Sequence, residues 1–161
     1  MKLSCPDMTF ALQLLMAAAL TTAPASAGAT PTAAEAAADR PESLLAAQQA
    51  AWNRGDLEGY MAGYWRSPAL TFFSGATITK GWQPTLDRYR KRYQGEGREM
   101  GQLTFSDLEV QPLDASSFFT RGRWLLTFKD KSKKPAQGVF TLLLRRVDEG
   151  LRIVHDHSSG E

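Results

Sequence analysis

The feature that most restricts the fold is the last third of the chain, where four strand-forming segments follow one another with only short turns between them. They span residues 102–110, 117–128, 138–147 and 151–158, separated by glycine, aspartate and proline. A tight turn over 148–150 joins the last two segments. Because strands joined by short connections pair antiparallel, this region predicts a four-stranded antiparallel meander.

Helical patterns precede these strands. The segment 41–53 begins with a proline, which suits a first helical turn, and a glycine follows its end. Apolar residues recur at helical spacing over 57–65, a short hairpin is expected over 69–80, and a third helix is expected to end at Tyr93. Helices grouped apart from an antiparallel sheet indicate the α+β class.

The first long strand contains a change in the alternation of its apolar residues. Leu103 and Phe105 share one face, but Leu108 and Val110 continue in the opposite phase. This shift predicts a β-bulge near residues 106–107, which would bend the sheet. A curved sheet wrapped around about three helices would form a cone with an internal pocket.

The first 27 residues have the pattern of a secretory signal peptide. Lys2 precedes the apolar run 10–20, and Ala25-Ser26-Ala27 fits the rule for cleavage after small residues. The run is shorter than the ~20 residues that cross a bilayer, and it lacks the polar face that a core helix would have. We therefore expect a periplasmic or secreted protein with no stable membrane anchor after cleavage, a flexible leader over 28–41 and one domain over 42–161.

Cysteine content and charge exclude several classes of function. The single cysteine, Cys5, lies within the predicted signal, so the mature chain would form no disulfide and bind no metal through cysteine. The formal net charge of +2 is too small to indicate a nucleic-acid partner. No cofactor is predicted.

Two segments resemble a known family. The helix junction 51–58 (AWNRGDLE) is similar to the first helix junction of the nuclear transport factor 2-like superfamily, in particular to its SnoaL-like and SgcJ-type branch. The ending 148–160 (DEGLRIVHDHSSG) supports this resemblance and is also similar to the end of the association domain of calcium/calmodulin-dependent kinase II. The resemblance covers residues 42–160 and implies a cystatin-like cone with an internal pocket, usually in a homodimer. Its members include isomerases, cyclases, hydrolases and oligomerising modules.

The two histidines are weak candidates for a catalytic role. His155 and His157 are two apart on one strand and so share a face, together with Leu151 and Ile153. Such a pair offers acid–base chemistry near neutral pH, ligand binding or two ligands of a metal. The alternative is a structural role in a hydrogen-bond network and at a dimer face. Asp156 alternates to the opposite face, so no metal site is predicted.

Several carboxylates and phenols are of the residue types that carry out acid–base chemistry. Asp107 lies near the predicted bulge, which can redirect a side chain into a site, so Asp107 is a weak candidate for a general base. Asp56 is better explained as a helix cap. Tyr60, Tyr64 and Tyr89 are able to donate a phenol hydrogen bond, but an aromatic stripe on a helix usually packs in a core. No position in the sequence combines a general base with a hydrogen-bond donor for an oxyanion.

Aromatic residues give the stronger indication of function, because so many large rings fill a small cone only with irregular space between them. Pockets are mostly apolar with a few polar groups. The predicted ligand-binding residues are Tyr64, Trp65, Trp82, Tyr89, Arg123 and Phe140, with Trp65 also expected to be buried against the sheet.

Three functions stay open at this point. The first is an exported protein that binds a small hydrophobic molecule. The second is an isomerase, dehydratase or hydrolase that acts on a small hydrophobic carbonyl compound in the same cavity. The third is a homodimeric interaction module whose pocket is vestigial. A buried histidine or aspartate in contact with open volume would favour the enzyme, an all-apolar cavity would favour binding, and a filled cavity would favour the module.

Overall fold

The computed structural model describes residues 39–96 and 98–160. The predicted signal peptide and residues 28–38 of the predicted leader lie outside this part of the chain. Over the residues described, no helix combines the length and apolar character needed to cross a bilayer. The elements, in chain order, are α2 (Pro41–Asn53), α3 (Leu57–Met61), β1 (Thr71–Ser74), β2 (Thr77–Lys80), α4 (Trp82–Tyr93), β3 (Gln102–Pro112), β4 (Ser117–Thr127), β5 (Ala136–Val147) and β6 (Gly150–Gly160).

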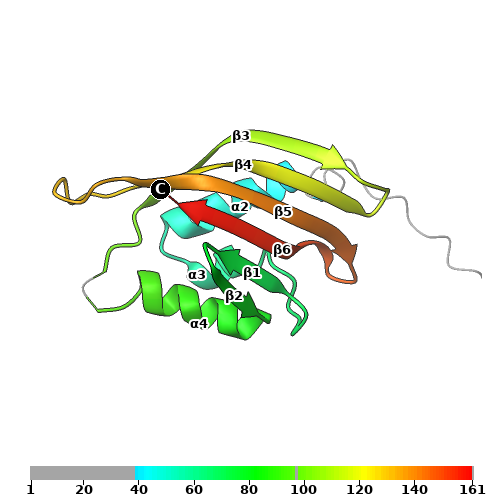
Figure 1. Ribbon diagram of the computed structural model, residues 1–161, viewed down its shortest axis with the longest axis horizontal. Coiled ribbons are helices and arrows are strands. Elements are labelled where there is room, and N and C mark those ends of the chain that lie inside the picture. Colours follow the sequence, from blue (N-terminus) through cyan, green and yellow to red (C-terminus); the bar gives the residue numbers. More distant parts are fainter. Residues whose placement is uncertain (1–38, 97, 161) are drawn as a thin grey trace, which may run out of the picture. The chain divides into compact units, whose positions relative to one another are not determined.

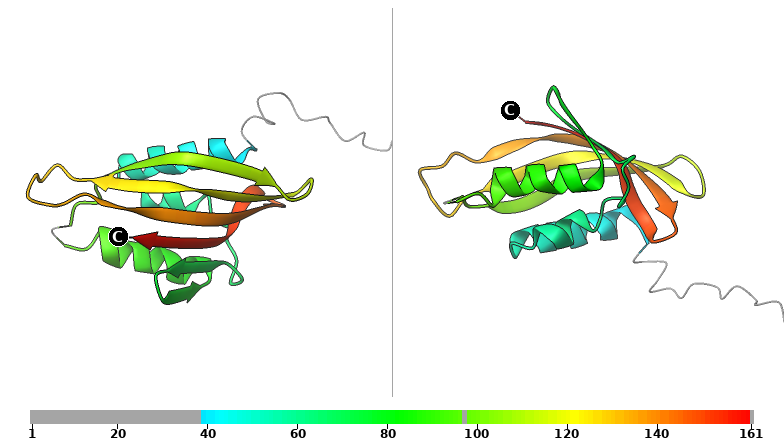
Figure 2. Two further views of the ribbon diagram at one scale, coloured as in Figure 1. Left: turned by 45° about the horizontal axis from the view of Figure 1, so that its top comes forward. Right: turned by 90° about the horizontal axis from the view of Figure 1, so that it is seen from below.

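The strands form one six-stranded sheet in the order β2-β1-β6-β5-β4-β3 (Figure 1). The four long strands make the expected antiparallel meander, and the β1–β2 hairpin joins it through a parallel pairing of β1 with β6. Helices α2 and α4 lie on the same side of the long strands, as the views in Figure 2 show. The α+β prediction of about three helices and a curved antiparallel sheet is confirmed, and the parallel pairing of β1 with β6 is an addition to it.

The junction between the first two helices follows from local chemistry. Gly55 has a positive φ of 81°, a conformation that glycine adopts without steric cost, and it ends the path of α2. Asp56 then caps α3, because its Oδ1 accepts a hydrogen bond of 2.7 Å from the backbone N–H of Gly59. The sequence-based expectation of a cap at Asp56 is confirmed.

The second helix is shorter than its apolar spacing predicts. It ends at Met61, and the chain then pairs with β6, since Trp65 N–H donates to the carbonyl of Ile153 and Ile153 N–H donates to the carbonyl of Gly63. Tertiary hydrogen bonds to the sheet thus replace the last helical turns. Trp65 is half-buried and lies outside the core, so the prediction that it is a buried helical residue is wrong.

Two bulges interrupt the meander. The predicted one is present in β3, where the register shifts between Ser106 and Glu109 and Asp107 has a φ of 51°. The other was not predicted. In β6, Leu144 faces Ile153 but Leu143 faces His155, which leaves Val154 unpaired. An unpaired residue reverses the alternation beyond it.

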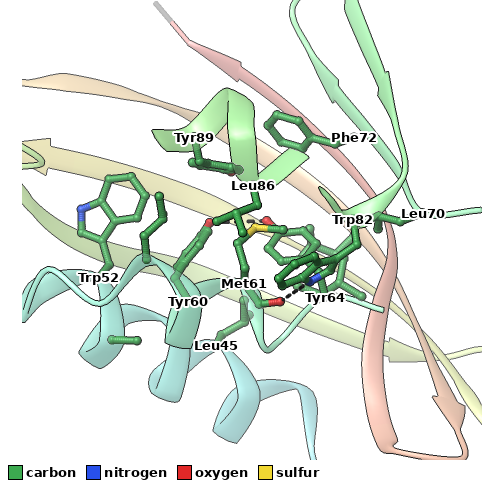
Figure 3. Close-up of a cluster of buried hydrophobic side chains, with 14 of the residues drawn as sticks. Leu45, Trp52, Tyr60, Met61, Tyr64, Leu70, Phe72, Trp82, Leu86 and Tyr89 are labelled. Carbon is green, nitrogen blue, oxygen red and sulfur yellow. Dashed lines mark hydrogen bonds between the residues drawn. The ribbon is translucent and has the colours of Figure 1, made fainter. Parts of the chain in front are cut away.

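The core lies between the helices and the inner face of the sheet, and its centre is aromatic. Figure 3 shows Trp52, Tyr60 and Tyr89 converging on one another from three helices. Their rings meet edge to face, with centroids 5.1 Å apart for Trp52 and Tyr60 and 5.5 Å apart for Tyr60 and Tyr89. Trp82 is fixed by a 2.9 Å hydrogen bond from its Nε1 to the carbonyl of Met61 (Figure 3).

Candidate functional site

A cavity of about 360 Å³ lies between the helices and the inner face of the sheet. Most of its wall is formed by buried apolar and aromatic side chains: Leu45, Trp52, Tyr60, Tyr64, Phe72, Tyr89, Leu103, Leu126, Phe140, Leu142 and Ile153. Its exposed lining residues include Gly75, Arg92, Ser159 and Gly160, which mark the opening to solvent.

The cavity persists because rigid rings that meet edge to face leave space that they cannot close. Phe140 extends from β5 toward Phe105 of β3, with ring centroids 5.4 Å apart. Gly122 of β4 makes room for this ring, since a Cβ there would lie 2.8 Å from the Cζ of Phe140. A larger residue at position 122 would push the ring of Phe140 out of place.

Asp156 places a carboxyl group at the cavity, and it is the only acidic side chain of the lining within residues 39–96 and 98–160. This residue is 3% exposed. Tyr64 donates a 2.7 Å hydrogen bond to Oδ2, and the Ser158 hydroxyl donates a 2.8 Å bond to Oδ1. Burial raises the pKa of Asp156 to about 6, because desolvation outweighs these two hydrogen bonds.

A chain of phenols extends from this carboxyl. The hydroxyls of Tyr60 and Tyr64 lie 3.4 Å apart, and both rings line the cavity. Burial, followed by the charge of Asp156, raises the pKa of Tyr60 and of Tyr64 above the usual value. Both phenols therefore keep their protons and act as hydrogen-bond donors. The site thus combines a carboxyl able to exchange a proton near neutral pH with phenols that stay protonated.

The two histidines lie on the other face of the sheet. The bulge at Val154 reverses the alternation of β6, so His155 and His157 face away from the core. The expectation that they share a face with Leu151 and Ile153 is therefore wrong. Their rings contact Phe73, with centroids 5.0 Å away for His155 and 5.9 Å for His157.

His155 is the more sheltered of the two. It is half-buried, and its Nδ1 lies 2.6 Å from the hydroxyl of Thr71. Burial, and secondarily the charge of His157, lower the pKa of His155.

Neither histidine lines the cavity. In the part of the chain that the structure describes, no three histidine, cysteine, aspartate or glutamate side chains are grouped so that they could hold a metal ion.

Asp107 and Arg123 also lie outside the cavity. Both are exposed on the outer face of the sheet, where Arg123 Nε is 3.2 Å from Asp107 Oδ2. The bulge in β3 therefore directs Asp107 toward solvent and this ion pair. Of the other residues predicted to bind ligand, Tyr64, Tyr89 and Phe140 line the cavity, whereas Trp65 and Trp82 do not.

Several residues of the lining do not follow from the sequence pattern. Strict alternation from Ile153 predicts the wrong face for Asp156, because the strand contains a bulge. Its position within the family-like ending 154–160 was a signal that pointed to it. Arg88 and Arg92 of α4 also line the cavity, although a run of basic residues on a helix usually faces solvent.

Comparison with known proteins agrees with this architecture. The SnoaL-like domain family matches residues 42–160. The chain belongs to the SnoaL-like domain family. This family lies within the nuclear transport factor 2-like superfamily, so the resemblance seen in the sequence is confirmed. Comparison with curated proteins gives no match.

Several solved structures resemble this SnoaL-like domain. A nuclear transport factor 2-like protein of unknown function from Shewanella oneidensis is 39% identical, with a TM-score of 0.66 over 72% of this chain and 93% of that one. A putative calcium/calmodulin-dependent kinase II association domain from Thiobacillus denitrificans is 22% identical, with a TM-score of 0.61 over 75% and 94%. A protein of unknown function with a cystatin-like fold from Nostoc punctiforme is 12% identical, with a TM-score of 0.63 over 81% and 93%. The last two likenesses show the fold alone.

The raised pKa of Asp156 predicts a pH dependence of stability. The folded state holds this proton up to about pH 6, whereas the unfolded chain releases it near 3.8, the ordinary pKa of an aspartate. The stabilisation is therefore present below the unfolded pKa and is lost as the pH rises through the folded pKa. We expect the unfolding free energy of the wild type to fall by up to about 3 kcal/mol relative to Asp156→Asn between about pH 4 and pH 7.

Denaturant unfolding of both proteins across this pH range measures the difference. The control is Asp107→Asn, the same substitution at an exposed carboxyl outside the cavity, which should keep the wild-type profile. Parallel profiles for the wild type and Asp156→Asn would contradict the assignment of a buried, proton-retaining carboxyl.

Proposed function

We propose that this SnoaL-like domain binds a small, largely hydrophobic molecule that carries a hydrogen-bonding group at its inner end. The observation that supports this most is the aromatic cavity of about 360 Å³ with one buried carboxyl in its wall. Ligand sites in proteins are typically apolar and concave, with a few polar groups that fix orientation. The cavity has this composition.

The volume limits the size of the ligand. An engineered apolar cavity of about 150 Å³ holds one benzene molecule. The cavity here is roughly twice as large, so it has room for a two-ring compound or for one ring with a short chain. The edges and faces of Trp52, Tyr60 and Tyr89 offer good contacts to such a ring.

Asp156 gives the proposed ligand its orientation. When protonated, its carboxyl is able to donate a hydrogen bond to a carbonyl oxygen, and when ionised it accepts one from a hydroxyl. Tyr64 and Ser158 hold the carboxyl in place through its two oxygens. A ligand with one carbonyl or hydroxyl at its inner end would form a further hydrogen bond with the Asp156 carboxyl.

Blocking the cavity tests the binding proposal. Ala136 lines the cavity and is half-buried, so Ala136→Trp should fill part of the space. We expect small molecules that copurify with the wild type, detected by native mass spectrometry followed by untargeted analysis of the released fraction, to be absent from Ala136→Trp.

The matched control is Leu113→Trp, which adds a ring of the same kind at a residue 54% exposed and outside the cavity. This variant should retain the copurified molecules. Equal occupancy in Ala136→Trp and the wild type would show that the bound molecules lie elsewhere.

A second candidate function is proton transfer, that is, isomerisation of a small hydrophobic carbonyl compound. It is favoured by Asp156, a buried carboxyl in contact with the open cavity, and by the pKa of this group, about 6, since a general base works best when its pKa lies near the working pH. The ionised carboxyl would take a proton from the carbon next to the carbonyl. The resulting carboxylic acid would return that proton to another carbon, which moves the double bond and restores the ionised carboxyl.

Deuterium exchange tests this candidate without knowledge of the natural substrate. In D2O near neutral pH, the wild type should speed the exchange of the α-protons of 2-tetralone and 2-indanone, as followed by proton NMR. Asp156→Asn should lower the catalysed rate by about 10²-fold or more, because it removes the base. Leu113→Trp should keep the wild-type rate, and exchange that is unaffected by Asp156→Asn would reject the catalytic role.

We further propose that the domain is exported and forms a homodimer. Export is supported by the signal pattern of residues 1–27. A dimer is supported by partly exposed apolar side chains on the outer face of the sheet, namely Phe73, Leu125, Val139 and Leu143. Apolar surface of this kind is typical of protein–protein contacts.

Native mass spectrometry of the periplasmic fraction of a bacterial host tests both proposals. The full chain should yield a species that begins at Gly28 and has twice the mass of the cleaved chain. Ala27→Lys should block cleavage, and Val139→Arg should give the cleaved monomer, because a charge would be buried in the interface. A full-length species in the cytosol would reject export, and a wild-type monomer would reject the dimer.

A further inference from the structure

The mouth of the cavity carries two arginines from one helix. Arg88 and Arg92 are four residues apart on α4, a spacing that places them on the same side of the helix, and both line the cavity. A guanidinium stays charged at all ordinary pH values. The opening of an otherwise apolar cavity is therefore positively charged.

The Arg88 side chain is held in position. It is half-buried, and its Nη1 donates a 3.0 Å hydrogen bond to the hydroxyl of Thr79 on β2. Its Cζ lies 5.3 Å from the ring centroid of Phe72, which is itself part of the cavity wall. These contacts place a positive charge at the edge of the aromatic wall and leave other guanidinium N–H groups available.

Arg92 is the more exposed of the two, and its Cζ lies 5.5 Å from the ring centroid of Tyr93, another residue of the cavity wall. Neither arginine forms an ion pair with an acidic side chain of residues 39–96 or 98–160. Arg90 lies between them on α4 but forms an ion pair with Glu58 and does not line the cavity.

No acidic side chain among the described lining residues neutralises the mouth. The other residues there are small or uncharged, including Ser74, Gly75 and Ser159. Asp156, the acid of the lining, is buried against Tyr64 and Ser158 rather than exposed at the opening.

We propose that Arg88 and Arg92 bind a carboxylate of the ligand, which makes the preferred ligand a hydrophobic monocarboxylate with its ring inside the cavity. The inference rests on the proposed binding function and adds the charge class of the ligand. Two guanidinium groups suit a carboxylate because each offers several N–H donors in a planar fork. The carboxylate faces solvent at the mouth, and the apolar part of the ligand is buried among the rings.

The test compares acids with their neutral amides, which have nearly the same shape. The probes are 2-naphthoate, indole-3-acetate and 3-phenylpropionate, each with the corresponding amide, and affinity is measured by isothermal titration calorimetry. We expect the wild type to bind at least one acid about tenfold or more tightly than its amide, with a preference that weakens as salt is added. The double variant Arg88→Gln/Arg92→Gln should lose that preference and still bind the amide.

The control is Arg90→Gln, which removes a charge from the same helix outside the cavity and should keep the preference. Binding of the amide by the double variant shows that its cavity is intact. Equal affinity of the wild type for every acid and its amide, or a preference retained in the double variant, would overturn the inference while leaving the binding function in place. If neither acids nor amides bind, or if Ala136→Trp binds them as well as the wild type does, the proposed binding function fails and the inference fails with it.

Discussion

The unpaired residue Val154 decides how the site of this SnoaL-like domain is built. Strand β6 runs through the middle of the sheet, between β1 and β5, and a single bulge reverses its alternation. Before the bulge, Ile153 faces the core, and after it Asp156 does. Without the extra residue, the histidines would face the cavity and the carboxyl would face away from it. One backbone irregularity therefore determines which titratable group the cavity contains.

The buried carboxyl depends in turn on the aromatic wall around it. Those rings remove water from Asp156, which raises its pKa, and one of them also supplies the Tyr64 hydroxyl that holds it. The same rings meet edge to face and leave open volume beside the carboxyl. Packing, electrostatics and cavity shape thus come from one set of side chains, so a change in this wall alters all three together.

The charged groups on the outer face of the sheet differ in arrangement from those at the cavity. On the outer face, Arg121 pairs with Glu109 and Arg123 pairs with Asp107, and both pairs are exposed. Toward the cavity, cations from α4 stand at the mouth and the carboxyl is buried. A ligand entering this cavity therefore meets positive charge first, then aromatic surface and finally a proton-exchanging group.

The sequence by itself determined the fold class, the antiparallel meander, the bulge in β3 and the cap at Asp56. These features are local: turn residues, capping groups and apolar periodicity act over a few neighbours in the chain. Tertiary structure decided where α3 ends, because the backbone near Trp65 pairs with β6. It also placed Asp156 and the α4 arginines at the cavity, since a bulge in a central strand and the packing of a helix against a sheet depend on contacts between residues far apart in sequence.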